Sequence, residues 1–264
     1  MAREESKETL RSLRDGFGEG IVLAARAKRA VVALSADLTE SNRLTRFKEL
    51  FPERFVEVGV AEQNLVGLAA GMARAGKIPF AASFAAFSPG RSWDQVRVSV
   101  CYSKLNVKLY GGHAGITVGE DGATHQALED IAITRVLPNM TVIVPADATE
   151  MRKATLAAAE MQGPVYLRGG RPKIPLVTKS EDPFTIGKAR VLRHGQEVSI
   201  VACGLMVGHA LRAAEILRKE GVRAEVINCH TIKPLDTRTL VRSAKKTGCV
   251  VTAEEHQVLG GLGS

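Results

Sequence analysis

Short apolar runs alternate with amphipathic stretches along most of the chain, and this alternation limits the fold more than any other feature. Up to residue 170 the predicted strands cover residues 30–35, 55–58, 78–84, 107–110, 141–144 and 165–167. The helical segments between them cover residues near 8–28, 61–75, 91–103, 126–135 and 148–161. Strand–helix–strand alternation predicts a parallel sheet with helices on both faces. Asp147 or Thr149 is predicted to cap the last of these helices.

A polar stretch with three prolines, residues 169–183, interrupts the pattern and is typical of a linker. A second α/β pattern follows, with strands at 198–202, 223–227 and 249–252 and helices at 206–220 and 236–246. We therefore predict an α/β protein of two doubly wound domains, at residues 1–170 and 185–264, joined by a linker at 171–184. Residues 259–264 read as a strand-to-helix turn, so the second domain is expected to be truncated or unusually small.

The composition is that of an ordinary globular protein, with 264 residues, of which 45% are hydrophobic and 24% charged. No apolar run reaches the roughly 18 residues of a membrane helix, and residues 1–15 lack the apolar core of a signal peptide. We expect a cytoplasmic protein. The net charge of +8 comes from scattered Lys and Arg, which favours a solvated surface or small anions over nucleic acid. The four cysteines are not spaced as metal ligands, and no metal site is predicted.

Glu62 follows a predicted strand and opens a helix rich in Ala and Gly. Ligands of open α/β sheets bind beyond the carboxyl ends of strands, which is where this carboxylate is predicted to lie. The alternative is that Glu62 only complements the helix dipole. The small residues at 67–73 indicate a helix packed very closely on something, with another subunit as one possibility.

A glycine-rich segment, residues 111–126, also follows a strand and contains His113, Asp121 and His125. Glycines allow close approach of a ligand to the backbone, and histidines suit proton transfer or phosphate contact near neutral pH. No GKS or GKT sequence follows, so a P-loop is excluded. The alternative is a polar loop whose histidines are satisfied locally.

Three other strand ends carry candidate residues. Phe84 and Phe87 predict either a flat apolar slot for an aromatic ring or simple core packing. At 35–42, Asp37 and Ser41 are either site residues or caps of the following helix. Two arginines follow the last strand of the first domain and suit phosphate or carboxylate, or lie on the surface beside the linker: Arg168 and Arg171.

Taken together, these segments resemble the transketolase family over essentially the whole chain. Four motifs occur in the family's order: SADL with a following Ser, GVxE before a small-residue helix, Ser-Phe-x-x-Phe, and H-x7-D-G-x-T-H. Residues 231–236 and 253–256 are similar to the family's C-terminal domain. The resemblance implies a pyrimidine-binding domain followed by that C-terminal domain, and a thiamine-diphosphate-dependent transferase.

The resemblance assigns the cofactor side of the site. Glu62 stands where the family's glutamate hydrogen-bonds a pyrimidine nitrogen of thiamine diphosphate and favours its imino tautomer. Phe87, with Phe84 nearby, matches the aromatic position that packs on the pyrimidine. Asp37 and Leu38 match the segment that faces the cofactor across a dimer.

The substrate side is assigned in the same way. His125 matches the histidine that touches the donor oxygens, and Asp121 matches the residue that reads the acceptor's C2 hydroxyl. The family's positions for the sugar phosphate fall on His113, Arg14, Ser41 and Arg171. Arg11 and Arg168 compete with Arg14 and Arg171 for these roles. Glu62, His113 and His125 are the expected catalytic residues.

One departure from the family matters. Its members bind the diphosphate and Mg²⁺ on another domain through a GDG motif, and no such motif occurs here. The resemblance therefore implies the C-terminal subunit of a split transketolase, active with a separate N-terminal, diphosphate-binding subunit as a heterotetramer. It would transfer a two-carbon ketol unit between sugar phosphates, a reaction of the pentose phosphate pathway.

Three alternatives stay open. One is an enzyme similar to 1-deoxyxylulose-5-phosphate synthase, which is normally a single chain. Another is the β subunit of a 2-oxoacid dehydrogenase, which does not usually carry the Asp-Gly-x-Thr-His loop. The third is a regulatory or scaffolding subunit without catalytic activity.

Overall fold

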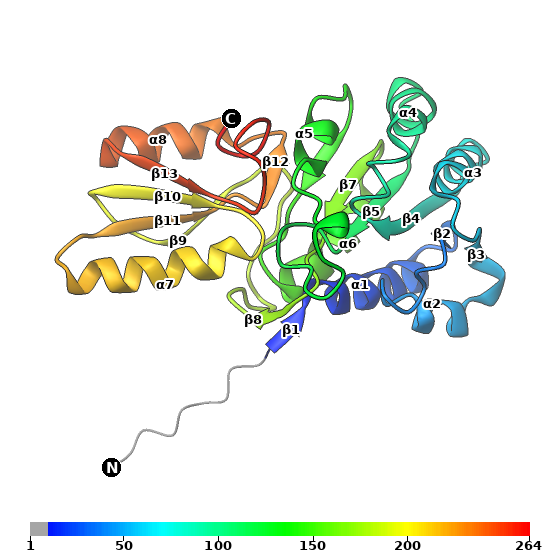
Figure 1. Cartoon of the computed structure of the whole chain (residues 1–264), viewed down its shortest axis with the longest axis horizontal. Helices are drawn as coiled ribbons and strands as arrows, with labels where there is room; N and C mark the ends of the chain where they lie inside the picture. The colour runs from blue at the N-terminus through cyan, green and yellow to red at the C-terminus, as the bar shows by residue number, and fades with distance from the viewer. Residues whose placement is uncertain (1–9) are drawn as a thin grey trace, which may run out of the picture.

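The computed structural model describes residues 10–264, so the first nine residues of the predicted first domain lie outside the description, as does the start of the predicted helix 8–28. Figure 1 shows two α/β units that lie side by side along the long axis of the molecule. Both units are built on largely parallel sheets, which confirms the predicted fold class.

Seven strands form the larger sheet, in the spatial order β12-β6-β7-β5-β4-β2-β3. All neighbours run parallel except β12, which is antiparallel to β6. The bounds are β2 Val31–Ser35, β3 Phe55–Glu57, β4 Ile78–Phe84, β5 Lys108–Gly112, β6 Thr141–Ile143, β7 Val165–Arg168 and β12 Thr231–Lys233. β2, β4 and β5 are buried along their whole length, as strands covered on both faces should be.

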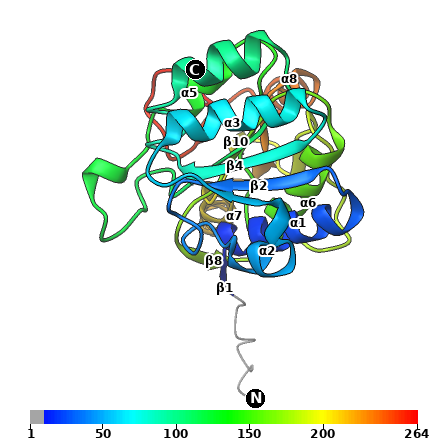
Figure 2. The same cartoon turned by 90° about the vertical axis from the view of Figure 1, so that its right-hand side faces the viewer.

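Helices cover both faces of this sheet, and Figure 2 shows α3 on one side with α1 and α2 on the other. Their bounds are α1 Leu13–Ala27, α2 Thr45–Leu50, α3 Glu62–Arg74, α5 Asp130–Arg135 and α6 Ala148–Glu160. Alternate residues of β2 enter different cores: Val32 and Leu34 pack with α3, whereas Val31 and Ala33 pack with α1 and α6. A short α4, Trp93–Gln95, continues into a π-helical segment, Val96–Tyr102, where one helix was predicted.

The smaller unit has a four-stranded sheet in the order β13-β10-β11-β9, with β9 antiparallel to β11. Its strands are β9 Arg190–Arg193, β10 Val198–Ala202, β11 Ala224–Asn228 and β13 Val250–Ala253. Its helices, α7 Met206–Lys219 and α8 Thr237–Thr247, lie on opposite faces of the sheet (Figure 1). The predicted strands and helices of this region are confirmed to within one or two residues, whereas β9 was not predicted.

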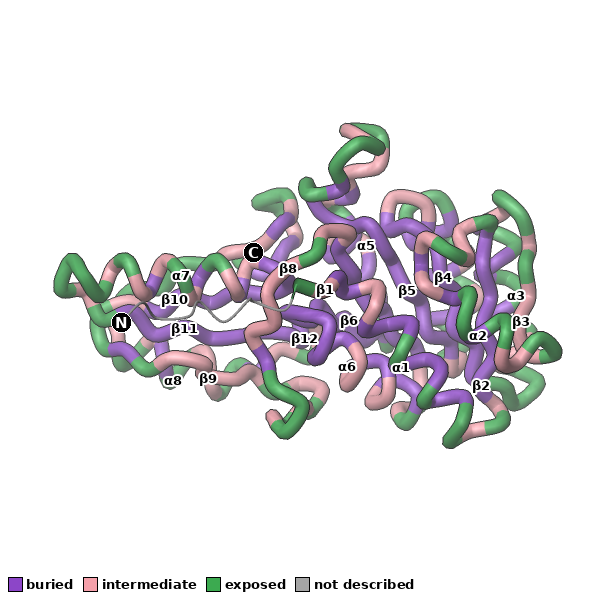
Figure 3. Tube along the Cα trace, turned by 90° about the horizontal axis from the view of Figure 1, so that it is seen from below, coloured by how far each residue is buried: buried purple, intermediate pink, exposed green. Residues whose placement is uncertain are grey.

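Strand β12 connects the two units, and the sequence did not predict it. It follows β11 of the smaller unit, yet it pairs with β6 at the edge of the larger sheet. Figure 3 shows the buried trace that runs through both sheets. A second unpredicted pair, β1 Leu10–Ser12 with β8 Lys173–Pro175, places a short strand inside the predicted linker. The boundaries at 171–184 stay a prediction.

Helix caps follow local sequence in most places. Asp147 accepts a hydrogen bond from the backbone N–H of Glu150 at 2.9 Å and so caps α6, as predicted. Ser12 and Asp15 form a reciprocal capping box at the start of α1. Neither Asp37 nor Ser41 caps α2, because that helix begins at Thr45, so the capping alternative for these two residues was wrong. No helix within residues 10–264 has the length and apolar character needed to cross a membrane.

Candidate active site

The predicted site residues lie at one edge of the larger sheet. Asp37 follows β2, Glu62 follows β3, and Phe87 follows β4. His113 follows β5 directly, and Arg171 follows β7. Because β2 to β7 run parallel, their carboxyl ends share this edge, which is the usual place for a ligand in such sheets.

Four aromatic and imidazole rings meet there. Phe84 stacks on His113 with ring centroids 3.7 Å apart and lies 6.0 Å from Phe87. His125 meets Phe87 and Phe84 edge-on, at centroid distances of 5.2 Å and 6.1 Å. Phe84 is buried, whereas Phe87 and His125 are partly exposed. The structure thus joins the two predicted phenylalanines to the two predicted histidines in one cluster.

His113 is a buried, neutral histidine. Its side chain is 2% exposed, and its Nδ1 atom has no hydrogen-bond partner within residues 10–264. Burial, aided by the positive charges of Arg14 and Arg171, lowers the pKa of His113 to about 3. Its backbone has a φ of 56°, an uncommon left-handed conformation for a residue other than glycine. A neutral ring with a free nitrogen can donate or accept one hydrogen bond to a ligand.

Glu62 is the first residue of α3 and is almost fully buried, at 2% exposure. Arg91 Nη1 donates a 2.9 Å hydrogen bond to Glu62 Oε2, and its own side chain is 52% exposed. The Arg91 guanidinium carbon also lies 5.0 Å from the centroid of the Phe87 ring. Arg91 therefore links the carboxylate to the ring cluster, a role that no sequence signal indicated.

Arg14, Ser41 and Arg171 meet beside His113. Arg14 Nη1 donates to the carbonyl of Ser41 at 3.0 Å, and Nη2 donates to the carbonyl of Arg171 at 3.5 Å. Arg14 Nε is buried and has no partner among residues 10–264. Burial lowers the pKa of Arg14, and the neighbouring Arg43 acts in the same direction. The region therefore carries concentrated positive charge suited to an anion.

The geometry separates the competing arginines. Arg168 is 5% exposed, and its Nε donates to Asp130 Oδ2 at 2.8 Å. Its Nη2 donates to the carbonyls of Ala127 and Glu255. Arg168 is thus buried with a buried carboxylate, whereas the Arg171 side chain is 28% exposed and pairs with the exposed Glu120. This difference in exposure favours Arg171 for an anionic ligand. Arg11 of β1 is ion-paired with Glu19 of α1, which favours Arg14.

The segment 113–126, which we call the histidine loop, carries the remaining residues that were predicted to contact a substrate. Asp121 is exposed, and Thr124 Oγ1 lies 2.8 Å from His125 Nδ1. Arg171 Nη1 donates to the carbonyl of Val118 at 2.5 Å, and its Nη2 pairs with Glu120 at 2.8 Å. These contacts tie the loop to the arginine side of the site.

Asp37 and Leu38 lie on the loop after β2. Asp37 has a left-handed backbone with φ 59°, and its N–H donates to Glu57 Oε1 at 2.7 Å. The Glu57 carboxylate also accepts from Thr39 and from the backbone of Gly59. Partial burial raises the pKa of Glu57, but these hydrogen bonds outweigh it and leave the pKa below its usual range. Glu57 thus joins the Asp37 loop to the turn that leads to Glu62.

Asn42 is a second residue that the sequence did not single out. It is fully buried, and neither atom of its amide has a partner within the described chain. Its Oδ1 approaches Gly112 so closely that a side chain at Gly112 would overlap it. Unsatisfied buried amides are rare in folded proteins, so Asn42 marks this part of the candidate site as a place for a ligand or water.

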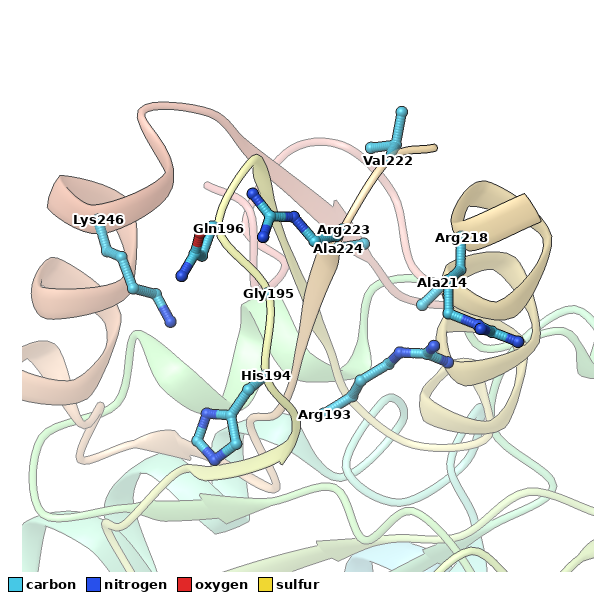
Figure 4. Close-up of a pocket in the computed structure, with 10 residues that line it drawn as sticks. All are labelled: Arg193, His194, Gly195, Gln196, Ala214, Arg218, Val222, Arg223, Ala224 and Lys246. Carbon is cyan, nitrogen blue, oxygen red and sulfur yellow. The ribbon is translucent and has the colours of Figure 1, made fainter. Parts of the chain in front are cut away.

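A cavity of about 510 Å³ lies elsewhere, in the smaller unit. Figure 4 shows its lining, which includes Arg193, His194, Arg218 and Lys246. Glu215 pairs with Arg193 and Arg218, and Glu225 pairs with Lys246. None of the predicted site residues lines this cavity. Within residues 10–264 no group of three or more His, Cys, Asp or Glu side chains is arranged to hold a metal ion.

Comparison with known proteins identifies both parts of the chain. Residues 11–176 match the transketolase pyrimidine-binding domain, and residues 187–264 match the transketolase C-terminal domain. A 6-deoxy-6-sulfo-D-fructose transketolase subunit from a Clostridium species is 47% identical over 96% of this chain and 78% of its own length. One subunit of an apulose-4-phosphate transketolase from Phocaeicola vulgatus is 39% identical, over 95% of this chain and 81% of its own. A solved split-gene transketolase, an inactive beta4 tetramer, is 48% identical with a TM-score of 0.89, covering 96% of this chain and 82% of its own.

Proposed function

Because the chain belongs to the transketolase family, we propose that it is the pyrimidine-binding subunit of a split, thiamine-diphosphate-dependent transketolase. The matched regions are the pyrimidine-binding and C-terminal domains. The sequence contains no GDG motif, so a separate subunit would supply the site for the diphosphate and Mg²⁺. Two copies of each subunit would then form the active heterotetramer.

The cofactor side of the site supports this proposal. Glu62 offers a buried carboxylate, of which one oxygen is bonded to Arg91 and the other accepts no hydrogen bond within residues 10–264. The partly exposed ring of Phe87 offers an apolar face close to it. A carboxylate and a ring face are what a pyrimidine with a basic ring nitrogen requires. Thiamine diphosphate, when bound, supplies a nucleophilic carbon for the cleavage of a ketose.

The substrate side supports transfer of a two-carbon ketol unit between sugar phosphates, as in the pentose phosphate pathway. The observation that carries the proposal is the ring cluster, in which Phe84 contacts both His113 and His125. The neighbouring Phe87 ring lies 5.0 Å from the guanidinium carbon of Arg91, the partner of Glu62. Neutral His113 would hydrogen-bond the substrate, and His125 would contact the donor oxygens and move a proton there. Asp121 would reach the acceptor's C2 hydroxyl.

Arg14, Arg171 and Ser41 would hold the anionic end of the sugar. Two of the relatives act on 6-deoxy-6-sulfo-D-fructose and apulose 4-phosphate, which end in a sulfonate and a phosphate. Arginine binds either group through the same paired hydrogen bonds. We therefore propose an anionic sugar as substrate, with a phosphate or a sulfonate at its end, and the cytoplasm as its location.

The direct test is to mix the chain with a candidate diphosphate-binding subunit, thiamine diphosphate and Mg²⁺. With xylulose 5-phosphate and ribose 5-phosphate we expect sedoheptulose 7-phosphate, measured by mass spectrometry, and none from either subunit alone. The same assay should also be run with 6-deoxy-6-sulfo-D-fructose and with apulose 4-phosphate.

Two results would redirect the assignment. Turnover of pyruvate would favour a 2-oxoacid dehydrogenase β subunit or, if 1-deoxyxylulose 5-phosphate forms with glyceraldehyde 3-phosphate, the corresponding synthase. A mixture that assembles but turns over none of these compounds would favour a scaffolding subunit.

A further inference from the structure

A side chain of the smaller unit reaches into the histidine loop. Glu255, two residues after β13, places Oε1 3.1 Å from the backbone N–H of Thr117, which donates a hydrogen bond to it. Gly115 lies against the same carboxylate. A Cβ atom at Gly115, where φ is +90°, would be 2.7–2.9 Å from the carboxylate atoms of Glu255. The loop backbone therefore packs directly on this carboxylate.

The backbone around Glu255 is held by the larger unit. Arg168 Nη2 donates to the carbonyl of Glu255 at 2.7 Å, and Gln257 donates from its backbone to the carbonyl of Leu128 at 2.8 Å. Next to it, His256 Nε2 accepts a hydrogen bond from the backbone of Ala132 at 3.2 Å. Arg168, which the sequence also offered for phosphate, thus helps to hold the backbone at Glu255.

Glu255 is only 9% exposed, yet no ion pair involves its carboxylate within residues 10–264. Burying a carboxylate is costly unless hydrogen bonds compensate. The compensation comes from Thr117, in the turn that separates His113 from His125. An apolar residue would fill the same space without the cost of removing a carboxylate from water. The presence of a carboxylate here is best explained by the hydrogen bond through which it holds the loop.

We propose that Glu255 is a positioning residue, through which the smaller unit holds residues 115–117 and so sets the placement of His113 and His125. The base of the loop is clamped by other contacts, since Gly115 donates from its backbone to the carbonyl of Ala127. Glu255 adds a second restraint, the hydrogen bond that it accepts from Thr117 two residues further on. The catalytic consequence rests on the proposed function, whereas the restraint on the loop does not.

The restraint is tested on the isolated full-length chain by hydrogen exchange of backbone amides. In Glu255→Ala we expect the Thr117 amide to exchange about tenfold faster, the change that corresponds to the loss of one hydrogen bond. Glu255→Gln should exchange as the wild type does, because its amide oxygen still accepts the bond. Glu255→Asp keeps the charge but shortens the side chain, so it should behave like Glu255→Ala.

Glu254→Ala is the matched control. The Glu254 carboxylate accepts hydrogen bonds from the backbones of Leu262 and Gly263, so its loss should speed exchange at 262–263 and leave 113–126 unchanged. Two outcomes would overturn the proposal. One is exchange at Thr117 that is unchanged in both Glu255→Ala and Glu255→Asp. The other is a Glu255→Gln chain that exchanges as fast as Glu255→Ala, which would assign the effect to charge.

The catalytic consequence is tested in the mixture with the partner subunit. Glu255→Ala and Glu255→Asp should lower kcat/KM for the anionic sugar about tenfold, with Glu255→Gln near wild type. The Kd for thiamine diphosphate should stay within about twofold, because Glu62 and Phe87 lie outside the loop. A parallel loss of cofactor affinity would indicate general destabilisation and contradict the proposal. A wild-type mixture without turnover would instead contradict the proposed function, and the exchange experiment would still decide the role of Glu255.

Discussion

Glu62 and Arg91 form an ion pair whose members differ sharply in exposure, at 2% and 52% of their side-chain surface. The carboxylate is fixed at the start of α3, while its partner reaches in from solvent. A ligand could therefore replace or join Arg91 without moving Glu62. At the scale of single residues, this pair is the best test of the cofactor assignment.

Replacing Glu62 with Gln keeps the volume but removes the group that shares a proton with a ring nitrogen. We expect turnover of the assembled enzyme to fall by roughly 10²–10⁴-fold, with little change in the melting temperature of the isolated chain. Steady-state kinetics and thermal melts check this. Glu53→Gln, at a carboxylate that is 70% exposed, is the control and should keep full turnover. If Glu62→Gln keeps turnover within about twofold of the wild type, a catalytic role for the Glu62 carboxylate is excluded.

His113 makes stability depend on pH. Its pKa falls to about 3 in the folded chain because the ring is buried near Arg14 and Arg171, whereas the unfolded chain binds the proton near pH 6.5. The free energy of unfolding therefore decreases as the pH falls from 6.5 towards 3, by about 2 kcal/mol at pH 5. His113→Asn removes this contribution.

Urea denaturation at pH 7 and pH 5 measures the effect. From pH 7 to pH 5, the free energy of unfolding of His113→Asn should fall by about 2 kcal/mol less than that of the wild type. His209→Asn, at an exposed histidine of α7, should follow the wild type. Equal losses in all three chains would show that folding does not lower the pKa of His113.

At the scale of elements, glycines in two helices have opposite surroundings. Gly16 of α1 lies on α6, and a methyl group there would overlap the backbone of Ala148. Beyond its own helix backbone, Gly67 of α3 has no atom of residues 10–264 within 4 Å of the position that a Cβ would take. Within residues 10–264, the close packing predicted for the small residues of α3 is therefore met only on its inner face, where Ala69 and Ala70 are buried.

Matched substitutions should separate these two environments. Gly16→Ala should cost about 1–3 kcal/mol through overpacking, whereas Gly67→Ala should stabilise the isolated chain by about 1 kcal/mol through helix propensity. Urea denaturation of each chain checks both signs. If the outer face of α3 packs on another subunit, Gly67→Ala should also weaken assembly with the partner. A stabilised variant that assembles normally would exclude that contact.

At the scale of the whole molecule, the two units share a buried polar contact. Asn228, at the end of β11, donates from Nδ2 to both oxygens of Glu150 on α6, at 2.8 Å and 3.0 Å. Burial raises the pKa of Glu150 to about 7, although the hydrogen bonds from Ala146 and Asn228 act to lower this pKa. A carboxyl group with a raised pKa stabilises the fold below its unfolded pKa of 4.5, and this contribution is lost as the pH rises through 7.

Glu150→Gln should flatten this dependence. At pH 8 we expect the variant to be more stable than the wild type by about 2 kcal/mol, the gain being reduced by an imperfect hydrogen bond to Asn228. At pH 5 the two should agree within about 1 kcal/mol. Denaturation series across this range check it, with the exposed Glu160→Gln as control. Parallel curves for wild type and Glu150→Gln would show that Glu150 is already ionised at pH 5.

Local patterning was enough to predict most of the fold. Continuous apolar runs marked the central strands, and small-residue or amphipathic stretches marked α1, α3, α6 and α7. Elements held by distant partners escaped prediction. β1, β8 and β12 are three residues long and exist because they pair with strands far away in the sequence. Short strands carry little periodic signal of their own.

The candidate site divides in the same way. The alternation of strands and helices predicted a ligand site at the strand ends. The resemblance to the transketolase family then pointed to Glu62, Phe84, Phe87, His113 and His125. The sequence could not indicate Arg91 and Asn42 or separate Arg171 from Arg168, because the roles of these residues depend on what lies opposite them. Arg168 faces the buried carboxylate of Asp130, whereas Arg171 faces the exposed Glu120.

By itself, the sequence determined the α/β class, the strand ends that carry the candidate site and the family to which the chain belongs. These depend on residue type and spacing along the chain, which local propensity and hydrophobic burial translate directly into elements. Only the tertiary structure decided that the smaller unit enters the larger sheet through β12 and reaches the histidine loop through Glu255. Such contacts join residues far apart along the chain, and burial and hydrogen bonding select them only when the whole chain has folded.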